Sequence, residues 1–327
     1  MLKSMTAIAI TAPGGPDVLV PRQRPIPTPA PNQVLIKVAY GGVNRHDCGQ
    51  RQRGQPPHGA TDIPGLEIAG TIVHVGAGVS RWREGDEVCA LVNGGGYAQY
   101  CVADAPLLLP IPNGFDLQQA AMLPEAMFTV WLNLFEIGRL RAGDWCLVHG
   151  GASGVGTIAI QVARALGINV MATAGSDAKA TLCTQLGAQA VCNYQREDFV
   201  TMVADATNGH GADVVLDMAG GGYAERNLRA VATDGRIVHL TAAGEPRYNV
   251  PLALIMQKRA IITGAMLRAY PLERKAWLAS ELLRTVWPML GSTIHPVLDS
   301  VFPLDDARGA HVRIESGEHA GKILLAN

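Results

Sequence analysis

The sequence has little net charge, and this excludes two classes of partner. Of its 327 residues, 27 are Lys or Arg and 28 are Asp or Glu, so the formal net charge is -1. A nearly neutral chain without a local basic patch lacks the long-range attraction that draws proteins to nucleic acid or to an anionic membrane surface. We therefore expect neither of these partners and favour a small-molecule ligand.

Long apolar runs and clustered cysteines are also missing. The most apolar stretch, residues 120–135, is interrupted by Pro124 and Glu125 and is shorter than the roughly 18 to 20 residues of a membrane helix. Residues 1–10 contain no apolar segment of the signal-peptide kind and read as a first strand. The six cysteines are scattered, which does not fit a zinc knuckle or a redox dithiol and indicates reduced thiols. These features predict a soluble cytoplasmic protein.

The length and the changing rhythm of the chain predict two domains of different architecture. Chains beyond about 250 to 300 residues usually divide. Up to residue 110, short alternating runs are separated by Gly, Pro and Asp clusters, as in a small irregular β-barrel. After a helical pattern over residues 115–140, buried-type strands alternate with amphipathic helices, which is typical of a parallel, doubly wound α/β sheet. Its strands are expected at residues 145–149, 169–174, 190–192, 213–217 and 236–240.

A glycine-rich turn at residues 150–156 lies between the first of these strands and a periodic helix that ends before Gly167. A diphosphate binds bare backbone N–H groups at a helix N-terminus, where a Cβ atom would hold it away. Gly154 and Gly156 meet that need. A glycine cluster alone is weak evidence and can be a tight turn without a ligand, but the strand, turn and helix together favour a dinucleotide.

The end of the second strand, residues 174–179, favours NADPH over NADH. Gly175 leaves room for a 2'-phosphate, Ser176 can donate a hydrogen bond and cap the next helix, and Lys179 adds positive charge. Two alternatives stay open at this point. Asp177 could bind the ribose hydroxyls instead, and Lys179 could belong to a solvated helix face.

Several further motifs occur in order along nearly the whole chain. Besides the glycine turn, they are Pro13-Gly-Gly-Pro16, Val43-Asn-Arg45, Pro64-Gly-Leu-Glu-Ile-Ala-Gly70, Gly85-Asp-Glu-Val88, Pro124-Glu-Ala126 with Thr129, Asn193-Tyr194 and Gly321-Lys-Ile323. In this order the motifs resemble the zinc-independent quinone oxidoreductases, the zeta-crystallin-like branch of the medium-chain dehydrogenase/reductase superfamily. The resemblance implies a GroES-like β-barrel domain at residues 1–121 and 262–327, a Rossmann NADPH-binding domain at residues 122–261 with the cofactor in the cleft, and a homodimer.

The same resemblance implies which residues contact NADPH. Asn44 and Thr129 are expected near the nicotinamide, with Met266 and Leu267, on an expected strand after Arg259, flanking it. His319 is expected to supply a polar cofactor contact. The diphosphate is assigned to Ser153, Gly154, Val155 and Gly156, and the adenosine 2'-phosphate to Gly175, Ser176, Lys179 and Tyr194.

Departures from the zinc-dependent relatives predict that there is no metal. Where those relatives have Gly-His-Glu, this chain has Gly65-Leu66-Glu67, and the four-cysteine structural lobe is missing. A catalytic zinc needs about three protein ligands. His46 and Cys48 are the only close His/Cys neighbours in the barrel region and are interpreted as loop or packing residues.

Without a Lewis acid, quinones and α,β-unsaturated carbonyls are easier to reduce than simple ketones, because conjugation spreads the incoming negative charge. We therefore expect NADPH-dependent reduction of a quinone or enone, with Asn44 as the main positioning candidate and Ser153 as a weaker one. Asn44 could equally be an amide that fixes its own loop. Three other activities remain open: an enoyl-thioester reductase, a metal-dependent alcohol dehydrogenase, and a cofactor-binding structural or regulatory protein.

Overall fold

The computed structural model describes residues 3–56, 59–241 and 247–327, and the chain divides into two compact units. The first unit contains Met1–Glu125, Lys275–Gly291 and Pro296–Asn327, and the second contains Ala126–Arg274 and Ser292–His295. We expected domain boundaries at 121/122 and 261/262, whereas the units divide at 125/126 and 274/275. The later second boundary follows from strand β13 (Ile261–Gly264), which pairs with β12 and so belongs to the sheet of the second unit.

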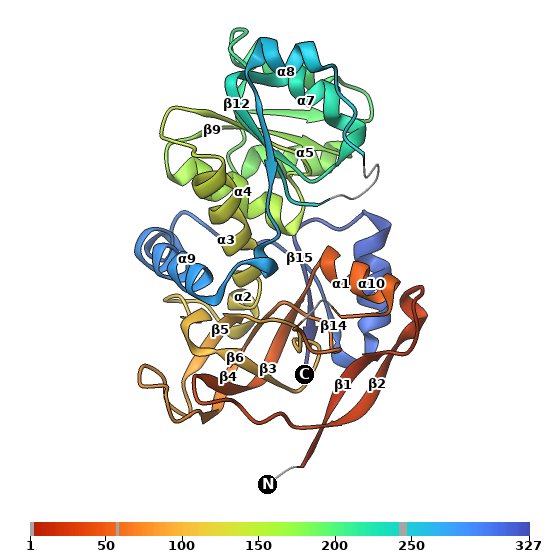
Figure 1. Cartoon of the computed structure of the whole chain (residues 1–327), viewed down its shortest axis with the longest axis vertical. Helices are drawn as coiled ribbons and strands as arrows, with labels where there is room; N and C mark the ends of the chain where they lie inside the picture. The colour runs from red at the N-terminus through yellow and green to blue at the C-terminus, as the bar shows by residue number, and fades with distance from the viewer. Residues whose placement is uncertain (1–2, 57–58, 242–246) are drawn as a thin grey trace. The chain divides into compact units, whose positions relative to one another are not determined.

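The second unit is built on a parallel sheet of six strands in the order β10-β9-β8-β11-β12-β13. Two of them, β9 and β12, are labelled in Figure 1. All five strand pairings are parallel. The chain starts at β8, adds β9 and β10 on one side, and returns to add β11 to β13 on the other, so that a topological switch point lies between β8 and β11. The strands are β8 (Trp145–Val148), β9 (Asn169–Ala174), β10 (Ala190–Asn193), β11 (Ala212–Asp217), β12 (Val231–His239) and β13.

Helical segments connect these strands, because parallel neighbours need long crossover connections. Helices α6 and α7 contact each other and α7 contacts α8, whereas the π-helix η3 contacts β11, β12 and β13. The helical segments are α3 (Pro124–Val130), which crosses the unit boundary, η3 (Trp131–Ile137), α4 (Gly154–Ala165), α5 (Asp177–Gln185), α6 (Phe199–Ala206), α7 (Ala224–Ala230) and α8 (Leu252–Lys258).

The first unit contains a seven-stranded sheet in the order β14-β15-β3-β4-β5-β7, with β6 paired to β3, and a separate hairpin of β1 and β2. The last strand of the chain, β15, is antiparallel to β3, so the C-terminal segment completes a sheet begun by the N-terminal one. The strands are β1 (Ser4–Ile10), β2 (Leu19–Pro25), β3 (Gln33–Val43), β4 (Glu67–Val75), β5 (Glu87–Leu91), β6 (Tyr100–Asp104), β7 (Leu108–Pro110), β14 (Leu298–Pro303) and β15 (Lys322–Ala326). The helices are α1 (Arg45–Arg53), α2 (Leu117–Ala120), most of α9 (Leu272–Thr285) and α10 (Ala307–Ser316).

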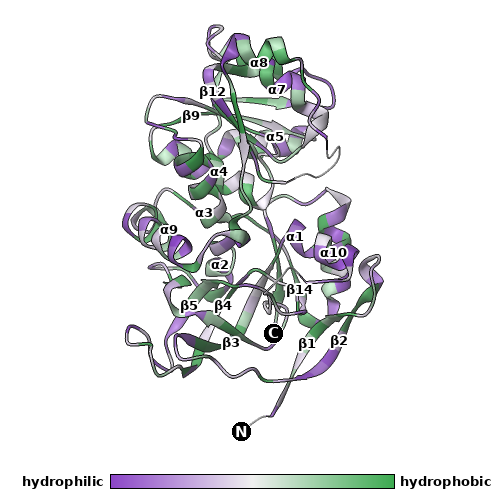
Figure 2. Ribbon diagram, in the orientation of Figure 1, coloured by the Kyte–Doolittle hydropathy of each residue, from purple (hydrophilic) through white to green (hydrophobic). Residues whose placement is uncertain are grey.

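Buried faces of helices and buried segments of strands build the cores. In Figure 2, α9 shows both hydrophilic and hydrophobic bands, and its buried side chains are Leu278, Ala279 and Leu282, at intervals of one, three and four residues. Strand β4 begins with four buried residues and continues with more exposed ones. No helix among the described residues is both long and apolar enough to cross a membrane.

The helical pattern expected at residues 115–140 is confirmed as three segments, α2, α3 and η3, with Pro124 starting α3 because proline cannot continue a preceding helix. Another expectation about local structure needs correction. Met266 and Leu267 are not on a strand: β13 ends at Gly264, and a short 3-10 turn begins at Leu267. The five expected strands of the nucleotide-binding unit are present, and β13 is a sixth.

Candidate functional site

The glycine turn has the backbone geometry of an anion-binding loop. Strand β8 ends at Val148, Ser153 caps α4, and the Ser153 Oγ accepts a hydrogen bond from the Gly156 N–H at 3.0 Å. A Cβ atom on Gly156 would lie 2.3 Å from the Gly150 carbonyl oxygen, so only glycine fits without moving the backbone. Ser153 thus caps the Gly156 N–H, whereas the N–H groups of Gly154 and Val155 in the first turn of this twelve-residue helix have no intrahelical acceptor and are available to an anion. The expected strand, turn and helix are therefore present, and the residues fit a dinucleotide diphosphate.

A buried polar network holds the neighbouring strand ends at the switch point. His149, which is 1% exposed, contacts the Thr173 Oγ1 through Nδ1 at 3.0 Å and the Asn227 Oδ1 through Nε2 at 2.8 Å. Asp217 accepts hydrogen bonds from Asn227 Nδ2 at 2.9 Å and from two backbone N–H groups beyond β11, and it pairs with His239 at 3.2 Å. Although burial alone would raise the pKa of Asp217, these hydrogen bonds and His149 lower it. Sequence reasoning located the strands but not this network.

The residues expected around a 2'-phosphate lie at or near the end of β9. A Cβ atom on Gly175 would lie 2.5 Å from the Tyr194 hydroxyl oxygen, so glycine is what lets these two segments approach. Ser176 caps α5 and accepts a hydrogen bond from the Lys179 N–H at 3.3 Å. Gly175 therefore lies beside Tyr194, and Ser176 beside the backbone of Lys179, whereas their contact with a 2'-phosphate stays a prediction.

Asp177, which the sequence left as a rival ligand for the ribose, already has partners. Its Oδ1 accepts a hydrogen bond from Asn193 Nδ2 at 2.7 Å and pairs with the Arg196 guanidinium at 2.6 Å. Both members of the ion pair are about 60% exposed. The arrangement offsets the charge of the carboxylate and places a cation, Arg196, at the first turn of α5. Arg196 was not identified from the sequence, where it is one of many charged residues in a loop.

In the first unit, the structure places Asn44 between two oppositely charged side chains. Asn44 caps α1 and donates its backbone N–H to the Asp47 Oδ2 at 2.8 Å. Its side-chain Nδ2 donates to the Glu67 Oε1 at 2.9 Å, and its Oδ1 accepts from the Lys322 Nζ at 2.9 Å. Glu67 and Lys322 form an ion pair, with side chains 0% and 3% exposed, and the second Glu67 oxygen accepts the Glu125 N–H at 2.9 Å. Sequence reasoning selected Asn44 but did not identify Lys322.

These residues do not fit a catalytic zinc. Leu66, in the place of the histidine of zinc-dependent relatives, is buried and has no donor atom, and Glu67 is engaged by Lys322. Within the described ranges, no three His, Cys, Asp or Glu side chains are grouped to hold a metal. His46 and Cys48 lie on α1, and burial raises the pKa of the Cys48 thiol to about 12, far from that of a metal-binding thiolate.

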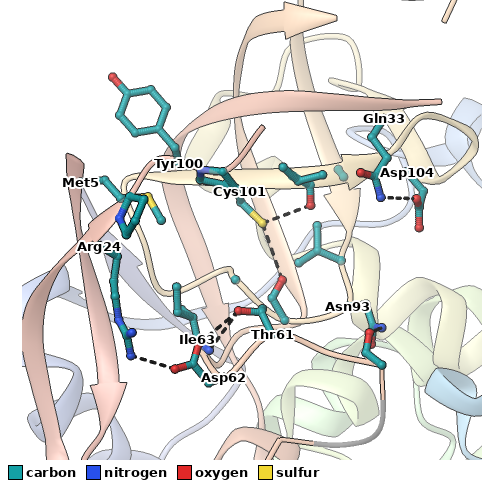
Figure 3. A pocket seen from close by; sticks show the side chains of 18 residues that line it. Met5, Arg24, Gln33, Thr61, Asp62, Ile63, Asn93, Tyr100, Cys101 and Asp104 are labelled. Atoms are coloured by element: carbon teal, nitrogen blue, oxygen red, sulfur yellow. Dashed lines mark hydrogen bonds and ion pairs between the residues drawn. The ribbon is translucent and has the colours of Figure 1, made fainter. Parts of the chain in front are cut away.

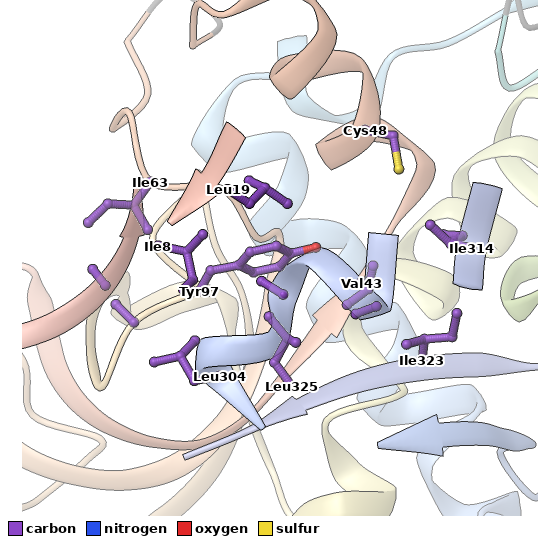
Figure 4. Close-up of a cluster of buried hydrophobic side chains, with 14 of the residues drawn as sticks. Ile8, Leu19, Val43, Cys48, Ile63, Tyr97, Leu304, Ile314, Ile323 and Leu325 are labelled. Carbon is purple, nitrogen blue, oxygen red and sulfur yellow. The ribbon is translucent and has the colours of Figure 1, made fainter. Parts of the chain in front are cut away.

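A second buried network supports α1 from the other side. The Arg51 guanidinium donates to His311 Nδ1 at 3.0 Å; the opposite nitrogen of this neutral ring, Nε2, is then the donor to the Tyr97 hydroxyl at 3.0 Å. Tyr97 in turn donates to the Asp47 Oδ2 at 3.1 Å, and Asp47 also accepts the Gly65 N–H. Figure 4 shows the Tyr97 ring inside the hydrophobic cluster that surrounds this network. Asp47, which holds the backbone of Asn44, is thus fixed by a chain of hydrogen bonds reaching α10.

This network predicts acid sensitivity. Burial, with the nearby Arg51 charge, lowers the pKa of His311 to about 4. In the unfolded chain this histidine binds a proton near pH 6.5, whereas in the folded chain it does not. The contribution of His311 to the free energy of unfolding is therefore complete above pH 6.5 and is lost as the pH falls toward 4. The loss is at most about 3 kcal/mol. Gln can accept from Arg51 and donate to Tyr97 without titrating. Between pH 7 and pH 4.5, the free energy of unfolding in urea should therefore fall less in His311→Gln than in the unmodified protein. An equal fall in both proteins would show that His311 is not responsible for the acid sensitivity.

The remaining expected residues are placed as follows. Thr129 lies on α3 and is 8% exposed. Met266 is 75% exposed and Leu267 is 8% exposed, both beyond β13. His319 is half-buried in the turn between α10 and β15. Their expected contacts with the cofactor stay predictions.

The first unit also contains a cavity of about 510 Å³ (Figure 3). The Arg24–Asp62 ion pair and the Gln33–Asp104 hydrogen bond lie along its wall, with Cys101 beside them. Asn44 is not among the residues that line it. We therefore do not assign the cavity to the candidate site.

Comparisons with known proteins identify two domain families and a relative that matches along nearly the whole chain. Residues 30–113 match the alcohol dehydrogenase GroES-like domain, and residues 154–283 match the family described as zinc-binding dehydrogenase. The chain is 33% identical to the quinone oxidoreductase of Rattus norvegicus over 330 residues, covering 99% of this chain and 98% of that protein.

Solved structures of quinone oxidoreductases are similar to this chain as well. The quinone oxidoreductase of Pseudomonas syringae has a TM-score of 0.89 at 27% identity, covering 99% of this chain and 100% of that one. The Escherichia coli quinone oxidoreductase complexed with NADPH has a TM-score of 0.88 at 28% identity, covering 99% of both chains. The chain therefore belongs to the medium-chain dehydrogenase/reductase superfamily, in its zinc-independent quinone oxidoreductase branch.

Proposed function

We propose that this protein is a zinc-independent, NADPH-dependent reductase of quinones and related activated enones. The observation that carries the proposal is the glycine turn at the switch point of a doubly wound sheet, in a chain similar to quinone oxidoreductases along its whole length. When bound, NADPH supplies a hydride from C4 of its nicotinamide, which with one proton from solvent converts a quinone to a hydroquinone and leaves NADP+. Six free, buried cysteines are consistent with a reducing cytoplasmic location, which we also propose.

Within the chain, Ser153 to Gly156 would hold the diphosphate, and Asn44 and Thr129 would serve the nicotinamide end. The Ser153 hydroxyl accepts from the Gly156 N–H and donates to the Met218 Sδ at 3.4 Å. Because its proton is used by Met218, just beyond β11, and one lone pair by the turn itself, we assign Ser153 to cofactor binding and not to proton transfer. Asn44 remains the candidate for contacting the substrate oxygen.

A panel of electron acceptors tests the reaction. Steady-state assays with NADPH should show higher kcat/KM for quinones such as menadione than for enoyl thioesters or simple ketones. Faster turnover of enoyl thioesters would make the protein an enoyl-thioester reductase instead. Tight NADPH binding without reduction of any activated carbonyl would favour a structural or regulatory role.

The 2'-phosphate surface predicts a measurable cofactor preference. Each exposed cation near a phosphate contributes modestly, on the order of 1 kcal/mol. We expect Lys179→Ala to weaken NADPH binding about 5- to 20-fold and to leave NADH binding unchanged, as measured by calorimetry. Arg196→Ala should have a double effect, because it removes a cation and also releases Asp177, which then favours NADH. Equal losses for both cofactors, or an unchanged preference, would contradict the assignment.

We propose a homodimer as well. Strand β13 is the edge of the six-stranded sheet, and apolar side chains near it are exposed: Ile261 by 41%, Leu252 by 69% and Met256 by 70%. Figure 2 shows hydrophobic residues along α8, which carries two of them. An unpaired edge with apolar neighbours is suited to pairing with a second copy. Sedimentation equilibrium should give twice the mass of the chain.

A further inference from the structure

We propose that Lys322, together with Glu67, is a positioning residue that fixes the Asn44 carboxamide so that it offers the substrate an N–H donor and no acceptor. The inference rests on the proposed function, because it assumes that Asn44 contacts the substrate oxygen. It adds a role for the C-terminal strand β15, which carries Lys322.

The chemistry of the two charged partners determines which way the amide points. Lys322 has only donors at Nζ, so the Asn44 atom that it contacts at 2.9 Å must be the oxygen. The Glu67 carboxylate has only acceptors, so its partner at 2.9 Å must be the Asn44 nitrogen. A flipped amide would place NH2 against the ammonium and oxygen against the carboxylate. The orientation is therefore imposed by two opposite charges.

One hydrogen of the amide remains for a ligand. Asn44 Nδ2 has two hydrogens, and Glu67 takes one of them. Among the described residues, the other has only a contact of 3.5 Å with the Gly42 carbonyl oxygen, which is long for a hydrogen bond. Asn44 is half-buried while both charged partners are buried, so Asn44 is the most exposed residue of the three.

Stability does not explain why such a cluster is present. Removing two charges from water is costly, and well-packed apolar residues often serve as well or better than a buried ion pair. The chain also makes room for the cluster: a Cβ atom on Gly42 would lie 2.2 Å from Glu67 Oε1 and 2.5 Å from Glu67 Cγ. The Lys322–Glu67 pair instead gives the Asn44 amide an ammonium partner for its oxygen and a carboxylate partner for its nitrogen.

This orientation suits the reduction of a conjugated carbonyl. Negative charge develops on the carbonyl oxygen as the ring is reduced, and a donor fixed in advance stabilises it. An amide free to rotate would present its own oxygen part of the time, and that oxygen would repel the developing charge. The Lys322–Glu67 pair thus acts through Asn44, without touching the substrate.

A mutant cycle tests this role. Lys322→Met with Glu67→Gln removes both charges together, so no charge is left buried alone. We expect kcat for menadione to fall about tenfold, while the calorimetric dissociation constant for NADPH changes less than about threefold. Loss of an entire oxyanion donor typically lowers kcat by about 10²- to 10³-fold, and Asn44→Ala should approach that range. Adding the Lys322 and Glu67 changes to Asn44→Ala should lower kcat no further, because they act through the same amide.

Binding of an oxyanion gives a readout independent of turnover. The enzyme–NADP+ complex should bind 4-nitrophenolate. The variant that combines Lys322→Met with Glu67→Gln, the paired variant, should bind it about tenfold more weakly. If the paired variant does not fold, Asn44→Asp with Glu67→Gln keeps the charge count and the contact to Lys322 but offers the ligand a carboxylate. We expect that variant to fold, to bind NADPH and to lose both phenolate binding and reduction.

The outcomes separate the two proposals. The role of Lys322 would be overturned, with the proposed function left standing, by either of two results. One is a wild-type kcat and wild-type phenolate binding in the paired variant. The other is a further loss of kcat, as large as in the wild-type background, when the two changes are added to Asn44→Ala. A wild-type kcat in Asn44→Ala would overturn the placement of Asn44 at the reacting end, and the inference with it.

Discussion

Arg51→Met should lower the free energy of unfolding by about 3 to 5 kcal/mol, the loss expected when one partner of a buried charged network is removed. The Arg51 side chain is 2% exposed and donates to three acceptors: the Gly14 carbonyl at 3.0 Å, His311 at 3.0 Å and Glu315 at 2.7 Å. Methionine fills similar space but leaves all three acceptors without this donor. Urea unfolding followed by circular dichroism measures the loss.

Arg24→Met is the matched control in the same unit. Arg24 pairs with Asp62 at 2.8 Å, nearly the same distance as Arg51 to Glu315, but the two side chains are 40% and 59% exposed. Exposed ion pairs contribute about 0 to 1 kcal/mol. A similar loss in the two variants would mean that burial of the Arg51 network does not determine its contribution.

Gly156→Ala should weaken NADPH binding by at least about a hundredfold, equivalent to about 2.7 kcal/mol. The added methyl group would lie 2.3 Å from the Gly150 carbonyl oxygen and 2.8 Å from two Gly151 backbone atoms, none of which can rotate away. The turn must shift, and its N–H groups then no longer converge on the diphosphate. Calorimetry with NADPH measures the effect, and thermal unfolding should show a loss of stability as well.

The control for this change is Gly222→Ala. Gly222 lies in the same unit, and a Cβ atom there would meet nothing within 4 Å. We expect its affinity for NADPH and its melting temperature to stay close to those of the unmodified protein. If Gly156→Ala behaved like Gly222→Ala, the glycine turn would not hold the cofactor.

Sequence reasoning succeeded where the signal is local. The strand, glycine turn and helix around residues 145–166 follow from periodicity within about twenty residues, and the structure has them there. The same holds for Ser176, whose capping role depends only on Lys179 three residues later. Local patterns were less informative near Arg259, where a short strand ends before Met266.

The contacts that sequence reasoning missed join distant parts of the chain. Lys322 and Asn44 are 278 residues apart, and Arg51 and His311 are 260 residues apart. Nothing in the local pattern around Lys322 distinguishes a buried ammonium from a solvated one. Arg196 is closer to Asp177, but their pairing depends on the folding of β9 against β10, which brings the two loops together.

The central claim is that a pyridine nucleotide held by the glycine turn reduces a conjugated carbonyl without a metal ion. The most direct test is single-turnover oxidation of bound NADPH by menadione, recorded before and after exhaustive treatment of the protein with a chelator. We predict stoichiometric NADPH binding and the same rate of oxidation in both samples. Failure to bind NADPH, or loss of the reaction on chelation with recovery on adding zinc, would contradict the account.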